Sequence, residues 1–183
     1  YGVIEDFRGG DLVIDGGRTD GKFNETPDFQ DAIMYINWAG DSLTVKNGAY
    51  VKVNAANEVG RMTINAGTYA NVFDSKLESY EWINVAGELC VDINSLVTTK
   101  KIQGAGTIVV DAADLGSNPV TVVKADMSGF TGTVEIINND NAIFEITNEG
   151  LVVTSCVAQV GDIKFKSVAD AVLYAKENNM TDP

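Results

Sequence analysis

The sequence predicts an all-β solenoid, in which short coils stack so that each coil adds one layer of strands. The segment LTVKNGAYVKV (43–53) aligns without a gap with MTINAGTYANV (62–72), and the glycines of the two segments are 19 residues apart. Looser copies follow at 83–91 and 101–110. Each copy reads as an alternating strand, a glycine corner and a second strand. One such unit cannot bury its apolar face alone, whereas stacked units can.

A β-sandwich built from hairpins is the alternative fold. Its support is Asn47-Gly48, because Asn-Gly strongly favours a two-residue hairpin turn. Ala66-Gly67, at the same place in the second copy, is a much weaker signal. The regular spacing favours stacked coils, because hairpins need no such period. We therefore expect about five to seven coils with parallel pairing between equivalent strands. The residues expected to point inward are Val45, Val51, Ile64, Val85, Val91, Ile108, Val110, Val134 and Ile136.

Two short strands and a polar loop are expected near the start of the chain. Val3-Ile4 and Leu12-Val13-Ile14 are β-rich and are closed by glycine pairs. The polar loop spans 18–31. Several oxygen ligands suit calcium, but the carboxylate spacing here is not that of an EF-hand. A solvated acidic loop is the alternative, and we favour it. The weak calcium-ligand candidates are Asp15, Asp20, Asp28 and Asp31.

The strand pattern continues with a longer period beyond residue 111. Strands are expected at 120–123 and 151–153, the segments 128–137 and 142–146 continue the pattern between them, and a turn is expected at 138–141. The apolar run 32–38, earlier in the chain, fits either a short helix or a strand. The solenoid domain is therefore expected to span residues 1–153.

Residues 154–183 differ from the rest and are expected to form a hairpin and a helix. Gly161-Asp162 separates two alternating strands, which is a hairpin signal. Ser167 and Asp170 then form a variant capping box, with Asp replacing the usual Glu or Gln. Apolar residues at helical spacing follow. The unit is interpreted either as the start of a further repeat or as a cap, and both interpretations place the helix over an open end of the stack.

Two glycine-rich segments carry a resemblance to a known family. SGFTGTV (128–134) resembles a motif of the passenger regions of autotransporter-like bacterial surface proteins, and GAGTIVV (104–110) is similar to another. The resemblance covers roughly residues 40–153. It implies a right-handed parallel β-helix and a secreted or surface-displayed protein. The C-terminal unit resembles the hairpin and helix that often open a new β-helix in secreted surface proteins of gut-type bacteria.

Charge and composition exclude several classes of function. The formal net charge is −13 with only 13 basic residues, which argues against binding to nucleic acid or to an anionic membrane surface. There is no histidine, so the commonest general base and metal ligand is missing. No apolar run approaches the ~20 residues of a membrane span. The two cysteines, Cys90 and Cys156, are interpreted as buried free thiols, with a disulfide between them as the alternative.

These observations predict a non-catalytic structural protein with no cofactor other than the calcium considered above. A polysaccharide-degrading enzyme is the weakest alternative. Asp111 and Asp114 are close in sequence, but no partner for a general acid can be named. An adhesin or glycan-binding module is a stronger alternative. Its sugar-stacking candidates are Trp38 and Trp82, although we favour core or corner packing for these residues.

Self-association is the remaining expected partnership. A stack of strands has two open ends, and each end exposes unpaired backbone groups. Copies that add head to tail would form a fibre or sheath. A monomer whose helix covers the end is the alternative, and it is slightly favoured for an isolated fragment. The assembly candidates are Val3, Ile4, Leu12, Val13 and Ile14 at one end, and Val157, Val160 and Phe165 at the other.

Overall fold

The structure is a computed structural model of the 183-residue chain, and it is mostly β with one short helix. It describes residues 2–8, 10–16, 33–39, 42–46, 50–53, 61–178 and 180, with side chains for 10–16, 42–46, 51, 61–178 and 180. The elements are β1 (Gly2–Arg8), β2 (Asp11–Asp15), β3 (Ile33–Ala39), β4 (Ser42–Lys46), β5 (Tyr50–Val53), β6 (Arg61–Ile64), β7 (Tyr69–Phe73), β8 (Lys76–Ser79), β9 (Trp82–Val85), β10 (Glu88–Asp92), β11 (Leu96–Gly104), β12 (Thr107–Asp111), β13 (Val120–Phe130), β14 (Thr133–Ile137), β15 (Ala142–Thr147), β16 (Gly150–Ser155), β17 (Ala158–Val160), β18 (Ile163–Phe165) and α1 (Val168–Glu177).

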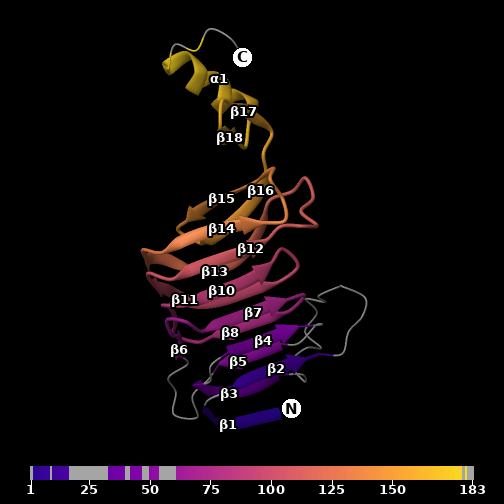
Figure 1. Cartoon of the computed structure of the whole chain (residues 1–183), viewed down its shortest axis with the longest axis vertical. Helices are drawn as coiled ribbons and strands as arrows, with labels where there is room; N and C mark the ends of the chain where they lie inside the picture. Colours follow the sequence, from indigo (N-terminus) through magenta and orange to yellow (C-terminus); the bar gives the residue numbers. More distant parts are fainter. Residues whose placement is uncertain are drawn as a thin grey trace.

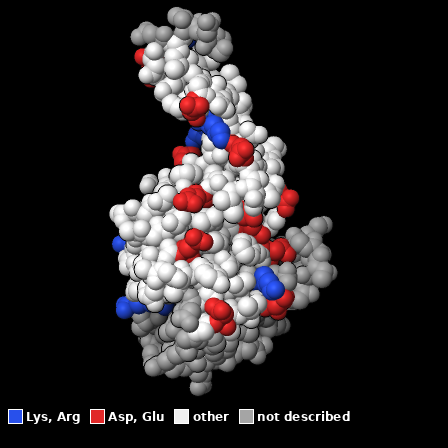
Figure 2. Space-filling view, viewed as in Figure 1, with Lys and Arg blue, Asp and Glu red and all other residues white. Residues whose placement is uncertain are grey.

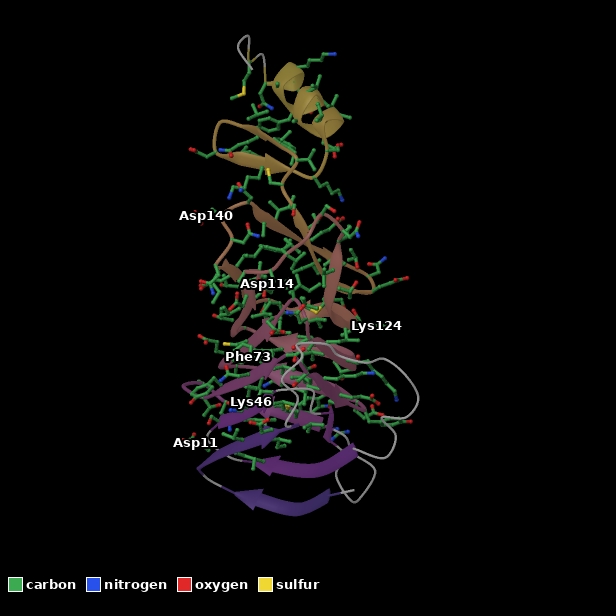
Figure 3. All side chains as sticks on the ribbon, turned by 90° about the vertical axis from the view of Figure 1, so that its right-hand side faces the viewer. Asp11, Lys46, Phe73, Asp114, Lys124 and Asp140 are labelled. Carbon is green, nitrogen blue, oxygen red and sulfur yellow. The ribbon has the colours of Figure 1, made fainter. Side chains whose placement is uncertain are left out.

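Two open sheets form the body of the protein. The six-stranded sheet has the order β14-β12-β10-β7-β4-β2, and the ten-stranded sheet follows β1-β3-β5-β8-β11-β13-β16-β15, with β6 and β9 beside this path. The strands stack along the long axis, with β1 at one end and α1 at the other (Figure 1). Figure 3 shows Lys46 and Phe73 of the six-stranded sheet on one side of the molecule and Lys124 of the ten-stranded sheet on the opposite side.

The register in the six-stranded sheet is parallel throughout. Leu43 pairs with Ala70, Ala70 with Leu89, and Leu89 with Ile108. The last two steps are each 19 residues, which confirms the predicted parallel pairing about 20 residues apart for β7, β10 and β12. β4 and β5 lie in different sheets, so residues 42–53 do not form the hairpin that the sandwich alternative requires.

The alignment of the first copy with the second was wrong. β4, in the first copy, belongs to the six-stranded sheet, whereas β6, aligned with it, belongs to the ten-stranded sheet. β4 pairs instead with β7. The chain therefore passes from the six-stranded to the ten-stranded sheet between β4 and β5, but from the ten-stranded to the six-stranded sheet between β6 and β7. Alternating apolar residues on both sides of a glycine look the same for either direction, so periodicity did not distinguish them.

The space between the two sheets is filled by the predicted inward-facing residues. Seven of the nine have no exposed surface: Val45, Val51, Ile64, Val85, Val91, Ile108 and Val110. Val134 and Ile136 also face the core but are only partly buried. They lie on β14, the outermost strand of its sheet in the described part of the chain, so one neighbouring layer fewer covers them.

Glycines occupy the corners that lead from the ten-stranded sheet to the six-stranded sheet. A Cβ on Gly87, Gly106 or Gly132 would lie within 2.2 Å of a backbone carbonyl oxygen in the preceding layer. The corner backbones are this close because hydrogen bonds join them, such as Thr133 N–H to the carbonyl of Gly106 at 3.0 Å. Only glycine leaves room for this contact. The two segments that carry the family resemblance thus supply stacked corners of successive layers.

The strand direction reverses after the last parallel layer. β16 pairs antiparallel with β13, and β15 pairs antiparallel with β16. β17 and β18 then pair with each other as the predicted hairpin. The run 32–38, left open between helix and strand, falls within β3 and the residue before it.

The predicted C-terminal helix is present as α1. Ser167 is its N-cap and accepts a hydrogen bond from the backbone N–H of Asp170, as the capping box requires. The Asp170 carboxylate accepts from the Ser167 hydroxyl at 2.6 Å. The principal contacts of α1 are with β17 and β18, including Tyr174 against Phe165 at 5.3 Å between ring centroids. α1 therefore packs mainly on its own hairpin, and none of its principal contacts among the described residues is with the terminal strands β14 and β15.

Candidate functional site

Of the four calcium candidates, only Asp15 lies in the described part of the protein. Asp15 lies on β2, and its carboxylate is 3.4 Å from the ammonium of Lys46. Asp20, Asp28 and Asp31 lie outside the described residues. Among the residues whose side chains are described, no three acidic or cysteine side chains are grouped to hold a metal ion.

Carboxylates do recur where the strands of the six-stranded sheet end, and there they bind backbone. Asp92 accepts from the backbone N–H of Asp74 at 3.0 and 3.2 Å, which joins two layers. Burial raises the pKa of Asp92, hydrogen bonds from Ser95 and from the Asp74 N–H oppose the shift, and the charges of Asp74 and Asp111 add to it. These carboxylates therefore shape the corners.

Asp111 and Asp114, the two residues considered for polysaccharide cleavage, have different surroundings. Asp111 accepts from the backbone N–H of Ala113 at 3.1 Å and from the Asn138 side chain at 3.0 Å. Asp114 is exposed on the following loop, as Figure 3 shows. Both carboxylate oxygens of Asp111 therefore accept hydrogen bonds, one within the turn and one from the next layer, and these bonds hold the corner together.

Trp82, the described member of the sugar-stacking pair, lies in a row of cations on the outer face of the ten-stranded sheet. Strand register places it between Arg61 on β6 and Lys101 on β11. The Arg61 guanidinium lies 5.7 Å from the centre of the indole ring, within the range of a cation–π contact. Trp38 lies on β3, and its side chain is outside the described set.

A second aromatic–cation pair adjoins the first in sequence. The ammonium of Lys100 lies 4.1 Å from the ring centre of Tyr80, which is 59% exposed. It also forms an ion pair of 2.8 Å with Glu81, and this hydrogen bond raises the pKa of Lys100. We name Arg61, Tyr80, Trp82, Lys100 and Lys101 the aromatic–cation face.

The assembly candidates fall into two different environments. Val3 and Ile4 lie on β1, and Leu12, Val13 and Ile14 lie on β2, so both groups occupy terminal strands of the sheets. At the other end the terminal strands are β14 and β15. Val157, Val160 and Phe165 instead belong to the hairpin region beyond them, where β17 and β18 pair with each other.

A groove of about 500 Å³ lies between the end of the stack and the C-terminal unit. We name it the junction groove. Its apolar lining includes Pro119, Ile143 on β15, Val152 on β16 and Phe165 on β18. Figure 2 shows basic and acidic side chains gathered beside one another at the neck between the stack and this unit. The groove therefore combines an apolar floor with a charged rim.

Two lysines of the hairpin region supply the positive side of this rim. Lys166 forms an ion pair with Glu145 of β15, and this contact raises the pKa of Lys166. Lys164 donates a hydrogen bond to the backbone carbonyl of Asp140. Asp140 lies at the top of the stack, next to the C-terminal unit, in Figure 3. These contacts tie the hairpin to the last turn and strand of the stack.

The cysteines are free and half-buried rather than fully buried. Cys90 lies on β10, and its thiol donates to the carboxylate of Glu88 at 3.0 Å. Burial, followed by the hydrogen bond and the charge of Glu88, raises the pKa of Cys90 to about 12. The Cys156 thiol donates to the carbonyl of Ala158 at 3.0 Å.

Sequence reasoning missed the partners of these sites. Arg61 lies 21 residues before Trp82, so the repeat period was the signal that could have paired them. Nothing in the sequence indicated Lys164 or Lys166, because their contacts depend on how the hairpin meets β15.

Comparisons with models of protein families, with curated proteins and with solved structures found no match. Among the described helices, none has the length and apolar character to cross a membrane.

Proposed function

We propose that this chain is a right-handed parallel β-solenoid that serves as a non-catalytic structural segment of a secreted or surface-displayed bacterial protein. The observation that carries the proposal is the continuous apolar interior between two sheets whose layers pair in parallel from β1 to β14. The stacking of Gly132 on Gly106 supports the resemblance to autotransporter-like passenger regions, because both resembling motifs supply the same kind of corner.

The architecture can be tested by cross-linking across one layer. Cys90 and Val109 are directly paired in adjacent parallel strands, a separation that a disulfide can bridge. In a Cys156→Ser background, Val109→Cys should form a disulfide with Cys90 on mild oxidation. Glu135→Cys, one layer further along the same row, is the matched control and should remain unlinked. Cross-linking in the control alone would overturn the predicted register.

The non-catalytic part of the proposal is tested by a screen for turnover of acidic and neutral polysaccharides. We expect no turnover. Turnover that disappears in Asp111→Asn or Asp114→Asn would overturn the proposal. Fractionation of the source bacterium with an antibody against this chain tests its location, and a signal confined to the cytoplasm would contradict secretion or display.

Glycan binding is a second candidate function, favoured by the aromatic–cation face. Trp82 and Tyr80 offer rings that stack on sugars, and the neighbouring cations suit an acidic glycan. Trp82→Ala should abolish retention on an acidic-glycan array, while Phe73→Ala, a partly buried aromatic on the other sheet, should retain it. If Trp82→Ala were retained as strongly as Phe73→Ala, glycan stacking by Trp82 and Tyr80 would be excluded, and packing would be their role.

Head-to-tail assembly is a third candidate, supported by the incompletely buried inward residues of both terminal layers. Leu12 on β2 and Val134 on β14 are only partly buried, and a second copy would cover both. Because the chain carries a net charge of −13, association should increase with salt or calcium, which screen the repulsion. Electron microscopy across a salt and calcium series tests this. Particles that stay monomeric throughout, with and without residues 1–14, would exclude assembly.

A further inference from the structure

Two lysines and two carboxylates line the junction groove, so their formal charges sum to zero, but they do not all pair with one another. Lys166 is matched by Glu145, with which it forms an ion pair. Asp170 accepts from the Ser167 hydroxyl at the N-terminus of α1, where the helix dipole stabilises a negative charge. Both carboxylates that line the groove are thus engaged by groups of the protein itself.

Lys164 is the exception in this rim. Its hydrogen-bond partner is the backbone carbonyl of Asp140, which is a neutral acceptor. An ammonium group has three N–H donors, and one such contact leaves two for another acceptor. Lys164 therefore presents an ammonium group that forms no ion pair with a described carboxylate, beside an apolar surface.

The apolar surface next to Lys164 is large enough for a small molecule. The groove has a volume of about 500 Å³, within the ~300–1,000 Å³ typical of ligand sites. Pro119, Ile143 and Val152 line one side, and Phe165 belongs to the opposite, hairpin side. An apolar body lying between these surfaces would be removed from water on two sides.

We propose that the junction groove binds an amphiphilic monocarboxylate of medium chain length. Its carboxylate accepts charge-assisted hydrogen bonds from Lys164, and its hydrocarbon body lies along Pro119, Ile143, Val152 and Phe165. This inference is independent of the proposed structural function, because it rests only on the groove. A negative result here would leave the structural proposal untouched.

Isothermal titration calorimetry with the whole chain tests the proposal, using ligands that share a ten-carbon tail. Decanoate, below its micellar concentration at neutral pH, should bind with one-to-one stoichiometry. Decanol should bind about tenfold more weakly, since it lacks the charge that Lys164 recognises. Equal affinity for decanol, or for decyltrimethylammonium, would show adsorption of the tail alone and would overturn the proposal.

Two variants and a matched control locate the site. Lys164→Gln should weaken decanoate binding about tenfold and leave decanol binding unchanged. Lys176→Gln, which removes an exposed lysine of α1 that does not line the groove, should change neither. Val152→Phe should weaken both ligands by filling the groove. Unchanged decanoate binding in Lys164→Gln would overturn the proposal even if Val152→Phe failed to fold.

Discussion

A Cβ placed on Gly106 would lie 2.2 Å from the carbonyl oxygen of Gly87, one layer below. The same carbonyl accepts a hydrogen bond of 2.9 Å from the N–H of Thr107. The close approach and the hydrogen bond depend on each other, because a corner that moved away to admit a side chain would lose the bond. The corner glycines thus set how tightly the layers stack.

Gly106→Ala is therefore expected to destabilise the protein by about 2 kcal/mol or more, because the backbone must shift to admit the methyl group. Gly116→Ala is the control, since nothing lies within 4 Å of the corresponding Cβ position. It should stay within about 0.5 kcal/mol of the parent chain. Urea unfolding followed by circular dichroism measures both. Equal losses in the two variants would contradict the stacked-corner interpretation.

Leu89→Ala should cost about 2–5 kcal/mol, the range for truncating a fully buried leucine. Leu89 has no exposed surface and lies between Ala70 and Ile108 in adjacent layers. Val13→Ala removes apolar atoms from a side chain that is 55% exposed on β2 and should change the free energy of unfolding little. Denaturant midpoints compare the two, and a larger loss at Val13 would place the core elsewhere.

Asp92→Asn is expected to change how stability depends on pH. Because burial raises the pKa of Asp92 above its ordinary 3.8, the folded state holds a proton that the unfolded state releases. Stability from this group is therefore gained as the pH falls from neutral through the raised native pKa, and the gain is complete below 3.8. The variant lacks this gain.

The free energy of unfolding should accordingly rise more in the parent chain than in Asp92→Asn as the pH is lowered from 7 toward 4. Chemical unfolding at several pH values measures the difference. Asp114→Asn, at an exposed loop residue, is the control. A parent chain that loses stability relative to the Asp92 variant over this range would show that the native pKa is lowered.

Cys90 should react slowly with thiol reagents at pH 8. A pKa of about 12 leaves on the order of one thiol in 10⁴ as the reactive thiolate. Glu88→Gln removes a negative charge beside the thiol and should accelerate the reaction, although burial, the largest cause, remains. Labelling in a Cys156→Ser background, monitored by mass spectrometry, gives the rates. Labelling of the folded chain as fast as a free thiol would contradict the assigned environment.

Ser167→Ala should destabilise α1 by about 0.5–2 kcal/mol, the usual cost of losing an N-cap. Because α1 packs mainly on β17 and β18, the effect should stay within residues 154–183. Hydrogen exchange should show faster exchange in α1 and unchanged protection in β10 and β12. Loss of protection in those central strands would mean that residues 1–153 and 154–183 unfold together, against the predicted domain division.

The sequence was sufficient to predict which side chains point inward, but not which strands pair or in which direction every strand runs. Val85, Val91 and Ile108 alternate with polar neighbours at a constant spacing, so their inward orientation follows from local pattern. The pairing of Leu43 with Ala70 is separated by 27 residues, and the longer connection concealed it. The reversal at β16 was equally hidden, because one strand's alternation carries no information on its direction.

The surfaces were harder to predict than the core for a related reason. Trp82 was identifiable as an aromatic residue, but its contact with Arg61 required the register of β6 and β9. The charged rim of the junction groove requires the position of the hairpin relative to β15, which depends on contacts such as Lys166 with Glu145. Such contacts join segments whose separation follows no repeat.

The orientation of the strand pairing also determines the response to tension. The hydrogen bonds between layers run along the long axis, and β1 and α1 lie at opposite ends of it (Figure 1). A force along that axis acts in line with the hydrogen bonds between neighbouring strands and breaks them one row at a time. Strands are therefore peeled from the ends, whereas a force across the axis would shear whole rows together. Each terminal layer has a neighbour on one side only and should detach first. Under force the chain would lengthen in steps of one layer, and each step would dissipate part of the applied work.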